Sequence, residues 1–391
     1  MIDLDRLRLD PRQLSDVAAA LEQRIREGLA ADGREVKALP AYLAPPTSAL
    51  EGEALVVDAG GTNLRAATVA LAAGEARVVA GPTTAELPVR GRGAPLDAAG
   101  FWRLQADRVA ELSPPPGLPL GYCFSYPSTV HADGDATLIS WTKGVAIEGV
   151  EGHRVGRPLA EALERRGFGP RSLVVLNDTV AALLGGSLGH PAPRRVIGLI
   201  CGTGTNMAAY FGPDVAPKLP GTAPMAVNLE SGNFHPPHLT PLDDAFDADG
   251  EAPGAQRFEK AVSGYALPYL FSRLVPDAGL EPAEGTGPLV ELRAQGSDRA
   301  RAAAGALLDR SADLIAAGLW GVSRTLGGRA PITVLAEGGL FWKAPGYADR
   351  VAETLARLAG GDDRHRFERR ADVNLVGSAL AALSTASNAS G

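Results

Sequence analysis

The spacing of apolar residues along the chain predicts helices that alternate with short strands. In residues 10–32, apolar side chains recur every three or four positions, which is the spacing of an amphipathic helix. Asp10 can cap this helix, and Pro11 suits its first position. Continuous apolar runs at 54–58 and 66–71 instead predict two strands that bend around a glycine-rich turn.

The same order of a strand, a glycine-rich turn and a second strand is predicted for residues 196–210, which read VIGLICGTGTNMAAY. The other periodic segments predict strands at 120–127 and 332–339, a strand that runs into a helix at 173–186, helices at 256–274, 298–327 and 346–359, and an apolar helix or strand–helix at 373–383. Residues 41–48 are expected to form a linker, residues 235–255 a Pro- and Asp-rich surface loop, and the final eight residues a disordered end. Strands that alternate with helices place the chain in the α/β class.

The composition limits the classes of function. With 391 residues the chain is expected to form two domains, and 45% hydrophobic with 21% charged residues is typical of a globular protein. A net charge of −7 argues against a general nucleic-acid or membrane surface, although a small anionic ligand such as a nucleotide remains possible. Two cysteines, Cys123 and Cys201, are expected to be buried packing residues. The start of the chain lacks an apolar signal core, so the protein is expected to be cytoplasmic.

Both glycine-rich turns carry residues suited to phosphate binding. Gly60-Gly61 permits close approach of a ligand to the backbone, whose N–H groups can form an anion cradle. Asp58 could orient a hydrated magnesium ion. The residues that could bind phosphate oxygens are Thr62, Asn63, Arg65, Thr203 and Thr205. One such turn alone predicts a tight hairpin without a ligand, whereas two matched turns favour a phosphate site.

These turns are similar to the phosphate segments of a known family. DAGGTNLR at 58–65 resembles the D-x-G-G-T-N-x-R segment of the hexokinase family, the branch of the actin-like ATPase fold that includes glucokinases. GTGTN at 202–206 resembles the second such segment of that family. The resemblance implies ATP with Mg²⁺ near Asp58. The glycines that it assigns to the nucleotide are Gly60, Gly61, Gly202, Gly204, Gly338 and Gly339.

Further fragments resemble the segments that bind the sugar in hexokinases. They are FSYPST at 124–129, SWTKGV at 140–145, LNDTVA at 176–181, VNLESGNF at 227–234 and FEKAVSG at 258–264. Each fragment alone is weak evidence, but together with the glycine turns they follow the family's order across residues 35–380. The sugar-contact residues that the resemblance implies are Ser125, Tyr126, Thr142, Lys143, Asn177, Asp178, Asn206, Glu230 and Glu259.

The resemblance also implies a mechanism and an architecture. Asp178 is expected to accept the proton of a hexose 6-hydroxyl, with glucose as the expected hexose, while Lys143 offsets charge near the transferring phosphoryl group. The expected fold is a two-lobed actin-like ATPase (ribonuclease H-like) with a central cleft. The expected lobes are a small one of 51–184 plus 372–391 and a large one of 1–50 plus 185–371. A monomer is the default, and a homodimer is possible.

Some positions depart from the family pattern and keep alternatives open. Glu337-Gly338-Gly339 stands where Asp-Gly-Ser is usual, so adenine binding and the phosphoryl donor, ATP or polyphosphate, stay open. Ser231 and Asn233 replace a Trp and an Ala beside Glu230 and could alter the preference among hexoses. A sugar kinase of the repressor–kinase superfamily is the alternative enzyme, but it would need a cysteine–histidine zinc motif. A sugar-sensing protein without turnover is the alternative of a different class.

Overall fold

The fold consists of two compact units built around separate β-sheets. The computed structural model describes residues 4–47, 49–61, 63–88, 96–142, 145–250, 252–328, 331–361 and 364–389. The first unit comprises Met1–Ala38, Ile197–Ala223 and Asn228–Arg369. The second unit comprises Leu39–Val196, Pro224–Val227 and Arg370–Gly391. The lobe boundaries expected from the sequence stay a prediction.

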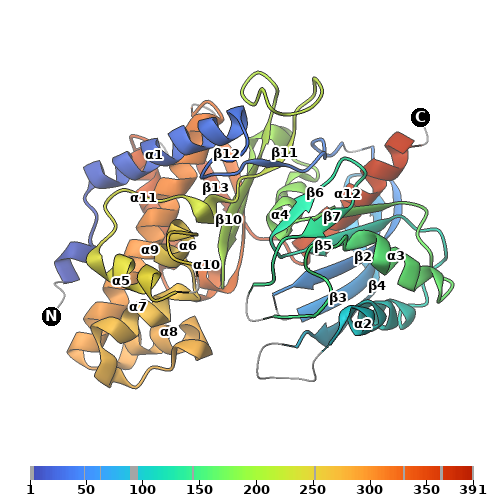
Figure 1. The fold of residues 1–391 in the computed structure, drawn as a ribbon. Helices are drawn as coiled ribbons and strands as arrows, with labels where there is room; N and C mark the ends of the chain where they lie inside the picture. The colour runs from blue at the N-terminus through green and yellow to red at the C-terminus, as the bar shows by residue number, and fades with distance from the viewer. Residues whose placement is uncertain are drawn as a thin grey trace. The chain divides into compact units, whose positions relative to one another are not determined.

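The second unit is built on a five-stranded sheet with the strand order β4-β3-β2-β5-β8 (Figure 1). Its strands are β2 (Gly52–Gly60), β3 (Asn63–Ala72), β4 (Glu75–Glu86), β5 (Leu120–Phe124) and β8 (Leu173–Leu176). The pairs β2–β3 and β3–β4 are antiparallel, whereas β2–β5 and β5–β8 are parallel. Because parallel strands end at the same edge of a sheet, the residues that follow β2, β5 and β8 gather there.

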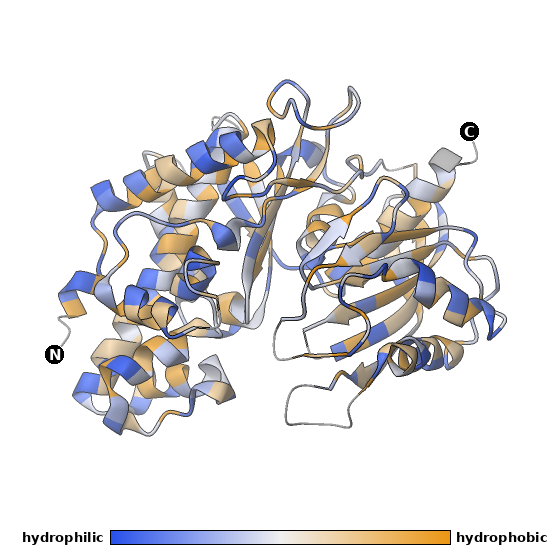
Figure 2. Ribbon diagram, in the orientation of Figure 1, coloured by the Kyte–Doolittle hydropathy of each residue, from blue (hydrophilic) through white to orange (hydrophobic). Residues whose placement is uncertain are grey.

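Helices cover both faces of this sheet. The helices of the second unit are α2 (Ala98–Ala110), α3 (Gly156–Glu164), α4 (Asp178–Ser187) and α12 (Val373–Ala389). Apolar residues of α2 and α3 join the strands in one buried cluster, and the strands themselves are largely apolar (Figure 2). On α12, a Cβ at Gly377 would lie 1.9 Å from the Ala181 carbonyl oxygen, so only glycine lets α12 pack this closely on α4. Smaller elements are β6 (Ser128–Val130) paired with β7 (Ala136–Leu138), and β1 (Leu39–Pro40) beside β11 (Met225–Asn228).

The first unit contains a sheet in which β10, β9, β12 and β13 are successive neighbours. These strands are β9 (Val196–Cys201), β10 (Thr205–Phe211), β12 (Ile332–Glu337) and β13 (His365–Glu368). Its helices are α1 (Pro11–Ala30), α5 (Pro241–Ala248), α6 (Arg257–Val262), α7 (Ala266–Leu274), α8 (Thr286–Gln295), α9 (Asp298–Thr325), α10 (Gly339–Lys343) and α11 (Tyr347–Leu358). The 28-residue α9 is the central helix, because α1, α8 and α11 all pack against it. Short 3₁₀ turns occur at Leu4–Leu7, Pro193–Arg195, Ser231–Asn233, Pro276–Ala278 and Pro282–Glu284.

The structure confirms most of the expected elements and corrects others. The N-terminal helix begins at Pro11 with Asp10 in a capping box. The surface loop expected at 235–255 is wrong in part, because Thr240 and Asp243 form a second capping box that starts α5. The disorder expected for the final eight residues is wrong as far as Ala389, where α12 ends. Both cysteines are buried, as expected. No described helix is both long and apolar enough to cross a membrane.

Candidate functional site

The first glycine turn lies between β2 and β3 and holds an ion pair between the buried Asp58 and the half-buried Arg65. Asp58 and Arg65 face each other across these strands, and Arg65 Nη2 lies 2.6 Å from Asp58 Oδ2. Arg65 Nη1 also lies 3.3 Å from Oδ1 of Asp372, which immediately precedes α12. Arg65, predicted to bind phosphate, is therefore held by two carboxylates from distant parts of the chain. Asn63 pairs with Gly60 at the turn, and Thr62 lies outside the described residues.

Burial sets the electrostatics of this turn. Burial raises the pKa of Asp58, although the Arg65 guanidinium partly opposes that shift. Burial and the neighbouring Asp58 carboxylate raise the pKa of the Cys123 thiol well above its ordinary value, so the thiol stays protonated. Asp58 Oδ1 is buried and accepts no hydrogen bond from a nitrogen or oxygen donor in the described part of the chain.

Gly60 keeps open the space next to this carboxylate. A Cβ at Gly60 would lie 3.3 Å from Asp58 Oδ1 and 3.5 Å from Ser125 Oγ. Only a residue without a side chain leaves room there for a polar ligand. An orphaned carboxylate oxygen and a glycine cradle fit a phosphate group with its hydrated magnesium ion, which usually keeps several water ligands. Among the described residues there is no cluster of three or more His, Cys, Asp or Glu side chains that could hold a metal ion.

Tyr126 connects the first glycine turn to the predicted sugar segment. Its hydroxyl donates a hydrogen bond of 2.5 Å to the carbonyl oxygen of Gly61, which has a left-handed φ of 53°. The Tyr126 ring packs against that of Trp141 with a centroid distance of 4.7 Å. Thr142 follows Trp141 and accepts the Val145 N–H through its carbonyl oxygen, and Lys143 lies outside the described residues.

Asn177 and Asp178 lie at the start of α4, directly after β8. The Asn177 side chain caps the helix by accepting the Thr179 N–H at 2.9 Å, and Asp178 Oδ1 accepts the same N–H at 2.8 Å. Because β2, β5 and β8 are parallel, Asp58, Ser125 and Asp178 lie at one edge of the sheet.

The second glycine turn lies between β9 and β10 in the first unit. A Cβ at Gly202 would lie 3.3 Å from the Cα of Gly338, and one at Gly338 would lie 2.2 Å from the Cys201 carbonyl oxygen. The structure therefore brings together three predicted nucleotide residues, Gly202, Gly338 and its neighbour Gly339. The carbonyl oxygen of Thr203 accepts the Tyr265 N–H at 3.1 Å.

The other predicted sugar residues lie close to this turn. Glu259 accepts the Thr205 N–H at 2.7 Å, and a Cβ at Gly204 would lie 2.8 Å from Glu259 Oε2. Asn206, on β10, donates to Asn228, which in turn donates to Glu230. The sequence reasoning missed Asn228 and Asp372. Asn228 lies two residues before Glu230 in the quoted VNLE segment, which was the available signal for it.

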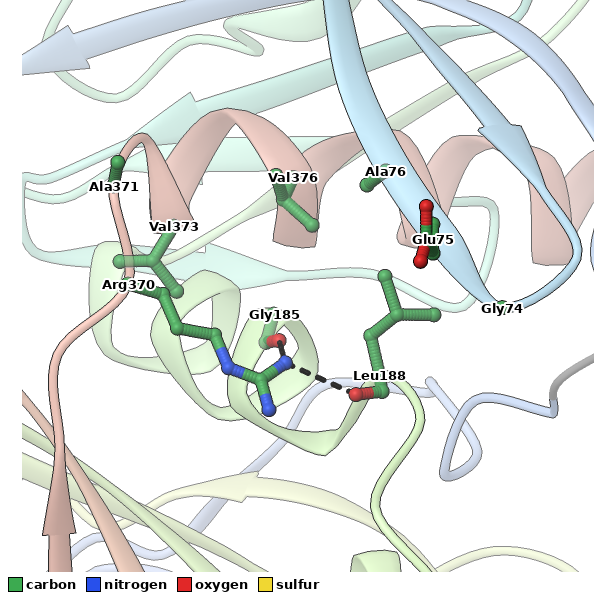
Figure 3. A pocket seen from close by; sticks show the side chains of 9 residues that line it. All are labelled: Gly74, Glu75, Ala76, Gly185, Leu188, Arg370, Ala371, Val373 and Val376. Carbon is green, nitrogen blue, oxygen red and sulfur yellow. Dashed lines mark hydrogen bonds between the residues drawn. The ribbon is translucent and has the colours of Figure 1, made fainter.

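A cavity of about 320 Å³ lies elsewhere in the second unit, at the ends of α4 and α12 (Figure 3). Arg370 reaches across it and donates hydrogen bonds of 2.9 and 3.0 Å to the carbonyl oxygens of Gly185 and Leu188. None of the predicted site residues lines this cavity. Its lining residues are Gly74, Glu75, Ala76, Gly185, Leu188, Arg370, Ala371, Val373 and Val376.

The family models and the curated relatives that match this chain point to one family. Two family models described as hexokinase match residues 4–188 and residues 196–280 with 290–384. A hexokinase of Schwanniomyces occidentalis is 34% identical over 62% of this chain, and the match spans 54% of that protein, about half its length. Hexokinase-2 of Solanum tuberosum is 29% identical over 95% of this chain and 88% of that protein.

The fold agrees with these matches. The structure of a Schistosoma mansoni hexokinase complexed with glucose superposes with a TM-score of 0.83 and 24% identity, covering 97% of both chains. This is the α/β architecture of the actin-like ATPase fold expected from the sequence. The chain belongs to the hexokinase family.

Proposed function

We propose that this protein transfers the γ-phosphoryl group of ATP to the 6-hydroxyl of a hexose. The observation that carries the proposal is the meeting of Asp58, Ser125 and Asp178 at one edge of the sheet, where a glycine turn with room for phosphate adjoins a carboxylate. Glucose is the first hexose to test, because the S. mansoni structure contains it. The expected products are hexose 6-phosphate and ADP.

Asp178 would act as the general base. Its carboxylate lies at the N-terminus of α4 and would accept the proton of the 6-hydroxyl. Lys143 would lie near the attacked oxygen and offset the negative charge that develops there. Ser125, Tyr126, Thr142, Asn177, Asn206, Glu230 and Glu259 would hold the hexose. Carboxylates and amides suit this role because a neutral polyol both donates and accepts hydrogen bonds.

The two glycine turns would hold the nucleotide phosphates through backbone N–H groups. Arg65, Thr62, Thr203 and Thr205 would add donors, and Gly338 and Gly339 would lie by the nucleotide. Magnesium supplies charge neutralisation on the phosphates when it is bound. Asp58 would accept a hydrogen bond from one of its water ligands.

A coupled assay tests the proposal. Glucose, fructose, mannose and glucosamine are each offered with MgATP and with magnesium polyphosphate. Asp178→Asn keeps the side chain's shape, so loss of the base alone should lower kcat by about 10² to 10⁴. Asp107→Asn, on α2 of the same unit, is the control and should keep its activity.

The outcomes separate the alternatives. Turnover that survives in Asp178→Asn would contradict the role of that base. Turnover with polyphosphate but not ATP would correct the donor. A hexose that raises the melting temperature without any turnover would favour the sugar-sensing alternative.

A further inference from the structure

A chain of directed hydrogen bonds connects two predicted hexose residues through Asn228. Asn206 Nδ2 donates to Asn228 Oδ1 at 2.7 Å, and Asn228 Nδ2 donates to Glu230 Oε1 at 2.8 Å. Asn228 Oδ1 also accepts the Glu230 N–H at 3.3 Å. Asn228 is 7% exposed, so its amide has little access to solvent partners. All three residues belong to the first unit.

Backbone N–H groups determine which atoms donate and which accept in this series of hydrogen bonds. Asn206 Oδ1 accepts the N–H groups of Met207 and Ser231, at 2.8 and 3.1 Å. The amide nitrogen of Asn206 must therefore point to Asn228, because flipping the amide would place N–H groups against N–H groups. Asn228 then presents its oxygen to Asn206 and its nitrogen to the Glu230 carboxylate. In both asparagines the side-chain oxygen therefore accepts hydrogen bonds and the side-chain nitrogen donates them.

One residue that departs from the family pattern, Asn233, adds a side-chain hydrogen bond next to this arrangement. Glu230 has a left-handed φ of 53°, which non-glycine residues seldom adopt. The carbonyl oxygen of Glu230 accepts the Asn233 backbone N–H at 3.1 Å and its side-chain N–H at 3.2 Å. Ser231 is fully buried, and its N–H donates to Asn206. The Trp and Ala that the family usually has at positions 231 and 233 could not supply the side-chain donor of Asn233.

We propose that Asn228 is a positioning residue for hexose specificity, which rests on the hexose-binding roles of Asn206 and Glu230 proposed above. Asn228 does not contact the hexose. It sets which atoms of Asn206 and Glu230 donate and which accept, and thereby selects the pattern of sugar hydroxyls that can bind. A site that fixes hydrogen-bond directions discriminates strongly, because a mismatched ligand leaves a buried polar group unpaired.

The variant Asn228→Asp tests this role with almost no change in shape. It replaces the N–H₂ that faces Glu230 with an oxygen, so two carboxylates meet and one of them binds a proton more readily. The other titratable group that the contacts place nearby is Glu259 of α6, which accepts the Thr205 N–H and whose Cβ lies 3.3 Å from a Cβ built at Gly232. The measurement is the ratio of variant to wild-type KM for glucose between pH 5.5 and 8.5.

The expected ratio is about 10 or more at pH 8 and falls several-fold toward pH 5.5, where a shared proton restores a donor to Glu230. Asn228→Ala should raise the same KM at every pH without recovery. For both variants KM for MgATP should stay within about twofold of the wild type. A ratio for Asn228→Asp that is flat across pH, or an unchanged KM for glucose, overturns the proposal.

A second variant and a binding measurement cover the cases in which the first test cannot be run. If Asn228→Asp does not fold, Asn228→Ser carries the test, and an unchanged KM for glucose in it overturns the proposal. If the wild type binds glucose without turnover, the proposed activity fails, and calorimetric Kd values for glucose replace KM in the same comparison. A wild type that binds no hexose overturns both proposals, whereas an active wild type with insensitive Asn228 variants overturns this one alone.

Discussion

At the residue scale, Tyr126 shows what sequence patterns can and cannot predict. The sequence placed it among the sugar contacts by resemblance, and that role stays a prediction. Its hydrogen bond to Gly61 depends on the parallel register of β2 and β5, which pairs Ala59 with Phe124. Asp58, Arg65 and Asn228 lie in quoted motifs, whereas the bonds of Asn228 to Asn206 and of Asp372 to Arg65 form only through tertiary packing. Chemistry within one short motif could therefore be predicted, but contacts across 65 or 307 residues could not.

Tyr126→Phe should weaken nucleotide binding more than sugar binding, because it removes the hydroxyl that bonds Gly61 and keeps the ring that would lie against the hexose. The change leaves the Gly61 carbonyl oxygen without its donor and loosens the first glycine turn, at a cost of about 1–3 kcal/mol. We expect KM for MgATP to rise about 5- to 20-fold, with KM for glucose within twofold. Steady-state kinetics with each substrate varied in turn measures both. Tyr122→Phe removes a buried hydroxyl from the same unit and is the control. An unchanged KM for MgATP would show that this hydroxyl does not support the turn.

At the scale of elements, the periodicity of apolar residues predicted the long helices and the buried strands. It missed segments whose structure depends on capping residues or on tertiary contacts. The segment at 235–255 is rich in Pro and Asp, yet Thr240, Pro241 and Asp243 use those residue types to start α5. The helix expected at 256–274 is divided into α6 and α7, since the N–H of Gly264 instead bonds the Gly202 carbonyl oxygen at 2.7 Å. The largely exposed edge strand β4 and the helix α2 have a weak apolar pattern and were not predicted. The short helix α3 was also missed, although its apolar residues lie on one face.

A buried ion pair between α5 and α9 should determine much of the acid sensitivity of the first unit. Arg310 donates two hydrogen bonds of 2.8 Å to Asp243, and both side chains are at most 4% exposed. Burial raises the pKa of Asp243, but the Arg310 charge and the Thr240 hydrogen bonds outweigh it, so the pKa lies below its usual value. A carboxyl whose folded pKa is lowered contributes stability above its unfolded pKa of about 3.9 and loses it as pH falls through the folded pKa.

Asp243→Asn should therefore lower the free energy of unfolding by about 3–5 kcal/mol at pH 7, because it leaves the Arg310 charge buried and uncompensated. The difference from wild type should shrink as pH falls from about 4 toward the lowered folded pKa, because Asp243 then binds a proton in the unfolded wild type and finally in the folded one. Urea unfolding at a series of pH values measures this. Asp244→Asn, at a side chain that is 64% exposed, should cost no more than about 1 kcal/mol. A difference between Asp243→Asn and wild type that is constant down to pH 2 would contradict the assignment.

At the scale of the whole molecule, each unit takes its residues from segments far apart in the chain. The second unit begins at Leu39, yet it is completed by residues 370–391, whose α12 packs on α4, β2 and β5. The periodicity of apolar residues alone predicts an apolar segment at 373–383, but not the helix and strands on which it packs. The start of this returning segment makes two polar contacts within the unit. Arg370 donates to carbonyl oxygens at the end of α4, and Asp372 pairs with Arg65 beside the first glycine turn.

The pair between Asp372 and Arg65 should affect nucleotide binding far more than stability. Asp372 is 40% exposed at its side chain, so the pair contributes only about 0.2–1 kcal/mol to folding. Its second effect is to hold the Arg65 guanidinium, which the proposed function assigns to the phosphates. Asp372→Asn should leave the backbone unchanged, because Asn tolerates the left-handed φ of 51° at this position. We expect KM for MgATP to rise about three- to tenfold, with KM for glucose unchanged.

The control is Asp349→Asn, which changes an exposed acid at the start of α11. Equal KM values for MgATP in both variants and the wild type would mean that Arg65 is held by Asp58 alone.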